Sequence, residues 1–244
     1  MRLPVIDIST MAALAIMCVA ATAARAEDDV LRPFTATYAV EWRGITAGQS
    51  SLELTRTAPD RYVYQSRNRA RGIFRLAFPE AITQISEFSI VDGQVRPSSY
   101  RADEGSRDTS RDVTLNFDWA AGRVTGVSED QPVDVPIEPG VQDPLSVQIA
   151  LMRELAAGRS PSSFQLVDDG QVKEYAYTRE GETKLKTPLG ELATVIYSST
   201  REGSSRVTRL WLAPDLGWLP VRAEQRRRGK IEFAMQLRSL ERTP

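Results

Sequence analysis

The chain has 244 residues, and its 31 Lys and Arg residues nearly balance its 32 Asp and Glu residues, for a formal net charge of −1. This balance argues against a nucleic-acid-binding protein, because such domains are usually strongly basic. The sequence contains no histidine and only one cysteine, Cys18. That composition excludes Ser-His-Asp and Cys-His catalysis, zinc sites, histidine-ligated iron and haem, and a disulfide within the chain. We therefore expect neither a metal ion nor a cofactor.

The first 26 residues have the pattern of a secretory signal peptide. Residues 11–22 (MAALAIMCVAAT) are apolar but too few to span a bilayer, and Ala24-Arg25-Ala26 fits an A-x-A cleavage site. A lipoprotein signal at Cys18 is the disfavoured alternative, because no small residue directly precedes that cysteine. We therefore expect cleavage near Ala26, a periplasmic or secreted protein, and no transmembrane segment in the mature chain.

Alternating apolar and polar residues follow the signal peptide. In "FTATYAVEW", the side chains of Phe34, Ala36, Tyr38, Val40 and Trp42 fall on one face, as in a half-buried strand. The glycines of "RGITAG" then predict a reversal into "SSLELTRT". The same alternation continues in "RYVYQSRNR", "AITQISEFSIVDG", "VRPSSYRAD" and "DVTLNFDW". The first half of the mature chain is therefore predicted to consist of short antiparallel strands.

One segment, "DPLSVQIALMRELAAG" at 143–158, has the pattern of a helix instead. Asp143 is expected to be its N-cap, Pro144 its first residue and Gly158 the residue just past its end. Its apolar residues form two adjacent stripes, which are Leu145, Ile149, Met152 and Ala156, and Val147, Leu151 and Leu155. So wide an apolar arc, without the basic polar face of a membrane-surface helix, predicts a core helix near 143–157 packed against a sheet.

The second half of the chain returns to strands and ends in a meander. "SSFQLVDDGQVKEYAYTREG" predicts a hairpin that turns at Asp168-Asp169-Gly170. Strand 205–213 is expected to reverse through "PDLG" into a strand over 218–228, with Trp211 and Trp218 clamping the two strands. A turn at 228–230 leads into "IEFAMQLRSL". The predicted fold class is mainly β: a curved antiparallel sheet, β-roll or open barrel with one packed helix, in a single domain over 27–244. Two small β subdomains are the alternative.

Four blocks of the sequence together resemble a known family. "YAVEWRGITAG", "DPLSVQIALMRELAAG", "TPLGELATV" and "LWLAPDLGWLPVRAEQRRRG" occur in this order and are similar to the successive signature blocks of the bacterial exported domain-of-unknown-function family 3108. The resemblance covers the chain from about Phe34 to Leu240. It implies an envelope-located, β-rich fold with an inserted helix. It implies no activity, cofactor or catalytic residue.

A row of arginines is the first candidate for ligand binding. Arg67, Arg69 and Arg71 of "RNRARGIFR" would share one face of an extended strand. Their guanidinium groups are able to hold a phosphate or carboxylate of lipid, lipopolysaccharide or peptidoglycan through bidentate contacts. The alternative is a solvent-facing row that pairs with acidic neighbours across the sheet and contributes little to stability.

The apolar segment "GIFRLAFP", which follows directly, is the second candidate. Its near-continuous apolar residues fit either a strand buried on both faces or an apolar lip beside a cavity. If the roll is hollow, Phe74 and Phe78 would line a site for an acyl chain or another apolar ligand. The four tryptophans would contribute to the same site: Trp42, Trp119, Trp211 and Trp218. Core and cross-strand packing is the competing interpretation for these tryptophans.

Catalytic candidates are few. Six carboxylates lie on or near predicted strands, namely Glu41, Glu53, Glu80, Glu87, Asp118 and Glu224. Glycoside hydrolysis needs two carboxylates across a groove, and one sequence does not identify such a pair. The lysines lack an accompanying S-x-x-K or G-x-S-x-G motif, and the sequence contains neither a glycine-rich phosphate loop nor an acidic calcium loop. We therefore assign no catalytic residue.

The leading hypothesis is a non-catalytic periplasmic protein that binds an envelope component, either lipid-like or a polysaccharide, through the concave face of its sheet. A carboxylate-dependent hydrolase of envelope glycans is the first alternative. A scaffold protein that pairs with a partner through an exposed strand edge is the second. No nucleic-acid partner is expected, and the sequence identifies no protein partner.

Overall fold

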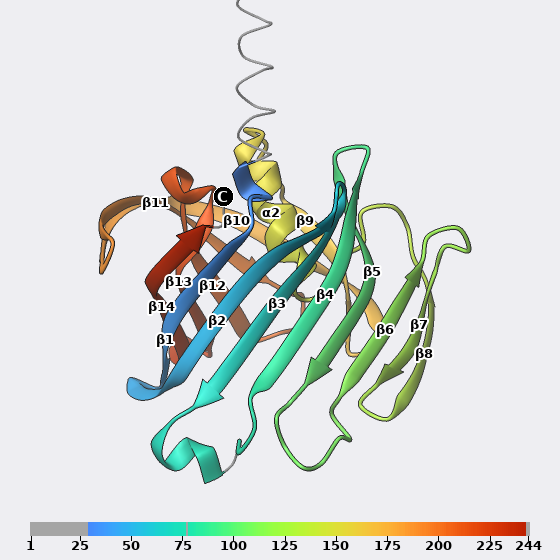
Figure 1. Ribbon diagram of the computed structural model, residues 1–244, viewed down its shortest axis with the longest axis horizontal. Helices are drawn as coiled ribbons and strands as arrows, with labels where there is room; N and C mark the ends of the chain where they lie inside the picture. Colours follow the sequence, from blue (N-terminus) through green and yellow to red (C-terminus); the bar gives the residue numbers. More distant parts are fainter. Residues whose placement is uncertain (1–28, 77, 243–244) are drawn as a thin grey trace, which may run out of the picture.

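One strongly curved antiparallel sheet forms the body of the protein (Figure 1). The computed structural model describes residues 29–76 and 78–242, so the predicted signal peptide and its cleavage site lie outside the described residues. Within these ranges, 14 strands lie in the spatial order β8-β7-β6-β5-β4-β3-β2-β1-β14-β13-β12-β11-β10-β9. The predicted fold class, a curved antiparallel sheet with one packed helix, is confirmed, and the sheet does not close into a barrel.

The strands are β1 (Phe34–Trp42), β2 (Ile45–Ala58), β3 (Arg61–Ala70), β4 (Ile82–Val91), β5 (Gln94–Asp103), β6 (Val113–Asp118), β7 (Arg123–Ser128), β8 (Gln131–Pro136), β9 (Ser163–Asp168), β10 (Gln171–Thr187), β11 (Gly190–Thr200), β12 (Arg206–Ala213), β13 (Leu219–Arg227) and β14 (Lys230–Arg242). The α-helix α2 (Ser146–Ala156) lies between β8 and β9 in the chain. Two short 3₁₀ helices, η1 (Gly72–Leu76) and η2 (Pro214–Leu216), join strands. Because β1 pairs with β14, the first and last strands lie side by side in the middle of the sheet.

Alternating burial along the strands identifies the face of the sheet that forms the core. In β1, the side chains of Phe34, Ala36, Tyr38 and Val40 are buried, while the residues between them are only half-buried. The same alternation in β2 and β3 buries the apolar side chains on one face of each strand. These residues share a cluster with those of α2, so the core-facing side of the sheet is its concave side.

Helix α2 occupies one end of the space that the curved sheet encloses (Figure 1). Ile149 and Met152 belong to the large core cluster, which includes Tyr38 and Tyr64. Leu151 and Leu155 pack instead with residues of β11 and β12, which are Val195, Tyr197 and Leu212. The two predicted apolar stripes of the helix therefore contact different parts of the sheet, and the helix joins those parts through apolar packing.

The helix begins at Ser146, later than predicted, yet Asp143 still caps it. Asp143 Oδ1 accepts hydrogen bonds from the N–H groups of Leu145 and Ser146, both at 2.7 Å. The Ser146 hydroxyl in turn accepts one from the Asp143 N–H at 3.0 Å, as in a capping box. Ser86 of β4 donates its hydroxyl to Asp143 Oδ2 at 2.6 Å. The cap therefore also fastens the start of the helix to the sheet.

Both edges of the sheet are partly blocked. The segment before α2 runs beside β9, where the Gln142 N–H donates to the Gln165 carbonyl at 2.8 Å and the Val167 N–H donates to the Gln142 carbonyl at 2.9 Å. The opposite edge strand, β8, contains Pro132 and Pro136, which have no N–H to donate. These features weaken the alternative of a scaffold that pairs through a strand edge.

The structure corrects two details predicted around residue 70. "GIFRLAFP" is not a strand, because residues 72–76 form η1, and Gly72 turns the chain out of β3 with a left-handed φ of 58°. β3 ends at Ala70, so Arg71 lies beyond it. The prediction that three arginines share one strand face therefore holds only for Arg67 and Arg69.

The C-terminal meander follows the prediction closely. β12 ends at Ala213, the chain reverses through η2 and Gly217, and β13 begins at Leu219. The Tyr38 hydroxyl donates to the Pro220 carbonyl at 2.9 Å, which ties this turn to the central strand β1. No helix within the described residues is both long and apolar enough to cross a lipid bilayer.

The cap generates a prediction about stability and pH. Replacing Asp143 by Ala leaves the N–H groups of Leu145 and Ser146 and the Ser86 hydroxyl without their partner, so we expect the free energy of unfolding to fall by about 1–3 kcal/mol. Urea unfolding of the wild type and of Asp143→Ala at one pH measures this loss. A variant as stable as the wild type would contradict the capping role.

The Asp143→Asn variant tests the charge separately from the cap. Burial raises the pKa of Asp143, against hydrogen bonds from Ser86, Ser146 and Leu145 that lower it. A carboxyl whose pKa is higher in the folded than in the unfolded state stabilises the fold fully at pH values below its unfolded-state pKa. This stabilisation is lost as the pH rises through the folded-state pKa. The stability of the wild type relative to Asp143→Asn should therefore decline as the pH is raised above about 4. A difference that grows with pH would contradict this assignment.

Candidate ligand-binding site

An apolar pocket of about 430 Å³ lies at the end of the roll opposite α2. Five strands, β1, β2, β3, β4 and β14, contribute to it together with η1 and the residues that follow η1. Its lining consists of Val40, Trp42, Ala47, Gly48, Gln49, Asn68, Arg69, Ala70, Phe74, Phe78, Ile82 and Phe233. Its volume lies within the range of about 300–1,000 Å³ that is typical of small-molecule sites.

The pocket continues the core-facing surface of the sheet. Val40 follows Tyr38 on the inner face of β1, and Trp42 follows Val40 and pairs with Phe233 of β14. At the other end of the roll, α2 covers this face, whereas here the side chains of Phe74 and Phe78 form a wall. The pocket is therefore the part of the apolar concave face that the helix leaves uncovered.

Gly48 keeps one side of the pocket free of side chains. It pairs with Ala70 of β3 and with Val40 of β1. A Cβ atom at position 48 would lie only 2.2 Å from the Arg69 carbonyl oxygen, so a larger residue there would push β2 and β3 apart. Small residues at 47, 48 and 70 thus create the hollow that the surrounding aromatic side chains enclose.

Backbone hydrogen bonds hold η1 against the sheet. The Arg71 N–H donates to the Ala47 carbonyl of β2 at 2.7 Å, and the Phe78 N–H donates to the Phe74 carbonyl at 3.0 Å. The Arg71 guanidinium also donates to Gln49 Oε1 at 3.1 Å. Phe74 and Phe78 are thereby placed over the end of the concave face, and both keep part of their surface in contact with solvent.

The chemistry of the pocket suits an apolar chain. Two of its polar side chains already make hydrogen bonds, since Gln49 accepts from Arg71 and Asn68 donates to the Ser66 hydroxyl at 3.3 Å. The remaining lining is mostly aliphatic and aromatic. Burying an alkyl chain here would remove apolar surface from water on both partners, at about 25 cal/mol per Å².

Four of the eight residues predicted to bind ligand meet at this pocket: Trp42, Arg69, Phe74 and Phe78. Of the two alternatives for "GIFRLAFP", the apolar lip beside a cavity describes its position. Trp211 and Trp218 do not reach the pocket. Trp211 is buried between the guanidinium groups of Arg209 and Arg222, whose central carbons lie 5.8 and 5.5 Å from its ring centroid.

The arginine row lacks the acidic partners that the alternative interpretation expected. Arg67 lies opposite Ser51 and Thr83, and Arg69 lies opposite Gln49. Within the described residues, Arg67 and Arg69 form no ion pair, and they point to the outer face because Ser66 and Asn68 point inward. Their charges are therefore available to solvent near the pocket rather than inside it.

Sequence reasoning missed several lining residues because their position depends on strand register. Phe233 lies 191 positions from Trp42 in the chain, yet the two residues pair directly across β1 and β14. Gly48 was interpreted only as part of a turn. Its position opposite Val40 and Ala70, which exposes the pocket floor, follows from the pairing of three strands.

A second hollow, which we call the basic groove, lies on the outer face of β1, β13 and β14. It measures about 860 Å³ and is lined by Glu41, Arg43, Gly44, Arg222, Arg227, Arg228, Lys230, Ile231, Glu232 and Ala234. Arg43 pairs with Glu232 at 3.4 Å. Arg227, Arg228 and Lys230 form no ion pair within the described residues, so the groove carries excess positive charge.

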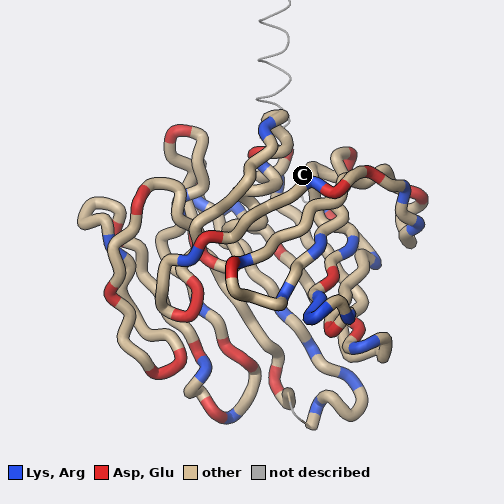
Figure 2. Tube along the Cα trace, turned by 180° about the vertical axis from the view of Figure 1, so that it is seen from behind, with Lys and Arg blue, Asp and Glu red and all other residues tan. Residues whose placement is uncertain are grey.

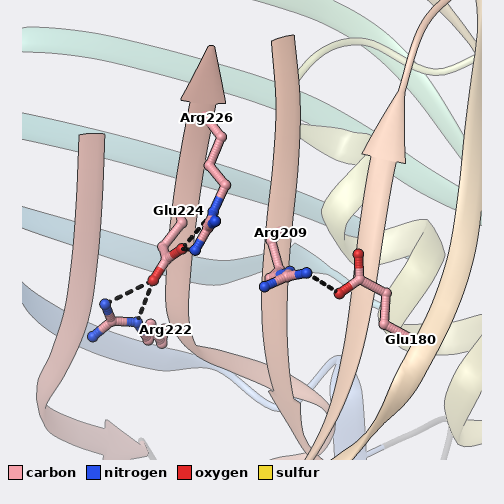
Figure 3. A network of polar contacts seen from close by, with 5 residues as sticks. All are labelled: Glu180, Arg209, Arg222, Glu224 and Arg226. Carbon is pink, nitrogen blue, oxygen red and sulfur yellow. Dashed lines mark hydrogen bonds and ion pairs between the residues drawn. The ribbon is translucent and has the colours of Figure 1, made fainter. Parts of the chain in front are cut away.

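Glu224 fixes the arginines beside this groove (Figure 3). Its two carboxylate oxygens accept hydrogen bonds from Arg222 at 2.7 Å and from Arg226 at 2.8 Å. On the adjacent strand β12, Arg209 pairs at 2.6 Å with Glu180 of β10, two strands further along the sheet. Burial acts to raise the pKa of Glu224, but hydrogen bonds and charge from Arg222 and Arg226 outweigh it and the pKa is lowered. Such a carboxylate stays ionised and is a poor general acid.

The other candidate carboxylates lie away from the apolar pocket. Among the described lining residues of that pocket there is no Asp or Glu. Glu87 pairs with Arg101 at 3.8 Å, and Asp118 accepts hydrogen bonds from the N–H groups of Ala120 and Ala121 in a turn. Within the described residues, no group of three or more Asp, Glu or Cys side chains is arranged to bind a metal ion.

A polar hollow of about 710 Å³ contains further acidic residues, including Asp168 and Asp169. Asp168 accepts hydrogen bonds from the Tyr175 hydroxyl at 2.7 Å and from Lys173 at 3.2 Å. Burial, together with this hydrogen bond, raises the pKa of Tyr175. Asp168 is thus paired locally in the β9–β10 hairpin.

Comparison with known proteins agrees with the resemblance seen in the sequence. Residues 37–230 match the family described as "Protein of unknown function (DUF3108)". No curated protein matches the chain. Among solved structures, the chain is similar to a β-barrel-like protein of the domain of unknown function DUF1849 from Brucella abortus, with 13% identity and a TM-score of 0.57 over 88% of this chain and 99% of that chain. At this identity the likeness shows the fold alone.

Two other solved structures are less similar. The complex of MucA and MucB from Pseudomonas aeruginosa matches with 16% identity and a TM-score of 0.39, over 88% of this chain and 53% of that chain. A protein with a YmcC-like fold from Bacteroides fragilis matches with 11% identity and a TM-score of 0.39, over 86% of this chain and 95% of that chain. Neither likeness carries an argument about function.

The Glu224 network generates a second prediction. Replacing Glu224 by Gln removes the negative charge between two arginines, so we expect a loss of about 1–2 kcal/mol in the free energy of unfolding at neutral pH. Because the folded-state pKa is lowered, this contribution is present above the unfolded pKa of 4.5 and is lost as the pH falls through the folded pKa. Urea unfolding at pH 7 and at acid pH measures both effects.

Glu182→Gln is the matched control for this measurement. Glu182 also pairs with an arginine, Arg179, but both side chains are largely exposed, so its replacement should change stability little. Equal losses in the two variants would show that Glu224 is an ordinary surface ion pair.

Proposed function

The chain belongs to the DUF3108 family of proteins of unknown function, and we propose that it is an exported protein that binds a lipid-like component of the cell envelope. One apolar chain of the ligand occupies the pocket beneath η1. The observation that carries this proposal is the uncovered apolar end of the concave face, enclosed by Trp42, Phe74, Phe78 and Phe233. A soluble domain does not normally leave such a surface unfilled.

A lipid-like ligand fits this pocket better than a polysaccharide does. A sugar ring would bring several hydroxyl groups into the site, and each needs a hydrogen-bond partner once it is buried. Gln49 and Asn68 already make hydrogen bonds within the protein. An alkyl chain makes no such demand, so its burial is favourable without any rearrangement of these side chains.

The expected location rests on the sequence. The apolar stretch at 11–22, followed by Ala24-Arg25-Ala26, supports export and cleavage near Ala26. Export would place the protein among lipids and other envelope components. Binding alone accounts for the features of the pocket, and no reaction needs to be invoked.

Native mass spectrometry of the protein purified from its own periplasm, combined with lipid extraction, tests this function directly. We expect a co-purifying molecule with at least one alkyl chain, near one per protein. A protein that is consistently empty, and that also fails to bind a fluorescent fatty acid in vitro, would contradict the proposal.

A pocket-filling variant locates the binding site. Ala70→Trp places an indole in the floor of the pocket, so we expect the affinity for a fluorescent fatty acid to fall by at least about tenfold. Ala120→Trp, in the exposed β6–β7 turn, is the matched control and should bind like the wild type. Phe74→Ala, which removes one wall without overpacking, should also weaken binding. Unchanged binding in both pocket variants would place the ligand elsewhere.

A further inference from the structure

Large apolar side chains are exposed mainly at one end of the molecule. Six of the eight that are exposed within the described residues are Trp42 at 41%, Ile45 at 62%, Ile73 at 76%, Leu76 at 89%, Phe78 at 36% and Ile231 at 36%. They come from the two strand ends that flank the β1–β2 turn, from η1 with the residues after it, and from the start of β14. The other two are Val127, near the end of β7, and Leu189, on the β10–β11 turn.

The segments that carry these six side chains are neighbours in space. The Arg43 N–H donates to the Glu232 carbonyl at 2.9 Å, which joins the β1–β2 turn to the start of β14. The Arg71 N–H donates to the Ala47 carbonyl at 2.7 Å, which joins the start of η1 to β2. All three segments lie at the lower left end of the roll in Figure 1, where the pocket is also found.

Positive charge is concentrated in the same segments. Residues 42–46, 71–76 and 226–231 contain no Asp or Glu. They contain seven Arg and Lys residues: Arg43, Arg71, Arg75, Arg226, Arg227, Arg228 and Lys230. Arg75, Arg227, Arg228 and Lys230 form no ion pair within the part of the chain that the structure describes. In Figure 2, which shows the molecule from behind, basic positions predominate at the corresponding lower right.

We propose that this end of the roll docks on an anionic lipid bilayer, with its exposed apolar side chains in the interfacial region and its arginines and lysine against the headgroup phosphates. Apolar tips flanked by basic residues are the combination that binds such surfaces. The charges and the apolar side chains alternate within each short segment, whereas the core of a protein–protein interface is depleted in charge. Charge complementarity therefore favours a lipid surface over a protein partner.

The docking surface rests on exposed side chains and does not require a ligand in the pocket. If both proposals hold, the pocket opens between segments that touch the bilayer, so an alkyl chain would pass between membrane and protein with little exposure to water. The two proposals make separate predictions, because different residues carry them. The docking residues Ile73, Leu76, Arg228 and Lys230 do not line the pocket, whereas Ala70 forms its floor.

Sedimentation with lipid vesicles tests the docking surface. The wild type should bind vesicles of phosphatidylethanolamine and phosphatidylglycerol, and binding should weaken as salt is raised, since screening shortens the reach of the basic residues. It should bind vesicles of phosphatidylcholine alone more weakly. No binding to the anionic vesicles at low salt would overturn the proposal.

Two variants separate the apolar contribution from the charged one. Ile73→Ser combined with Leu76→Ser should reduce binding to anionic vesicles by about tenfold or more. The triple variant Arg75→Gln, Arg228→Gln and Lys230→Gln should reduce it by about fivefold for each charge removed, and should leave binding to phosphatidylcholine vesicles unchanged.

Matched controls carry the same chemical changes elsewhere. Val127→Ser with Leu189→Ser removes the two exposed apolar side chains outside this end, and Arg61→Gln with Arg179→Gln and Lys184→Gln removes three charges outside it. Both controls should bind anionic vesicles like the wild type. Losses as large as those of the test variants would show that the docking surface lies elsewhere or that binding is unspecific.

The pocket variant distinguishes failure of docking from failure of the proposed function. Ala70→Trp should lose fatty-acid binding but keep vesicle binding, and the Ile73→Ser, Leu76→Ser variant should show the reverse. If Ala70→Trp alone abolished vesicle binding, the pocket would be the membrane contact and the docking surface proposed here would be wrong.

Discussion

The packing of α2 against separate parts of the curved sheet is the constraint on which the rest of the structure depends. One stripe of the helix meets the cluster around Tyr38 and Tyr64, and the other meets Val195, Tyr197 and Leu212. With no disulfide available, apolar packing and the polar cap at Asp143 fix the helix at one end of the roll. Because the helix is shorter than the strands around it, the opposite end of the concave face has no helical cover.

That uncovered end gathers the features that suggest a function. Small residues at 47, 48 and 70 make a hollow, and Phe74 and Phe78 close it from one side. Apolar side chains remain exposed around it, which is costly in water and is offset only when something covers them. An alkyl chain inside the pocket and a lipid surface against its rim would both remove this exposure. The basic residues nearby favour an anionic surface.

Local patterns predicted most of the fold. The alternation in "FTATYAVEW", the turn at Asp168-Asp169-Gly170 and the two stripes of "DPLSVQIALMRELAAG" correspond to β1, the β9–β10 hairpin and α2. These elements depend on residues close together in the chain. The candidate site was predicted only in part, because its remaining residues come together through strand register, as Phe233 and Trp42 do. Trp211 was assigned to the site by residue type alone, and its burial between Arg209 and Arg222 depends on the pairing of β12 with β13.

The most direct test of the account is a crystal structure of the protein with a long-chain alkyl phosphate. The account predicts an alkyl chain between Trp42, Phe74 and Phe233, with the phosphate toward the basic residues at the same end of the roll. A pocket closed by the protein's own side chains, with the alkyl phosphate bound at another place or not at all, would contradict the claim that the end opposite the helix is built to hold an apolar chain.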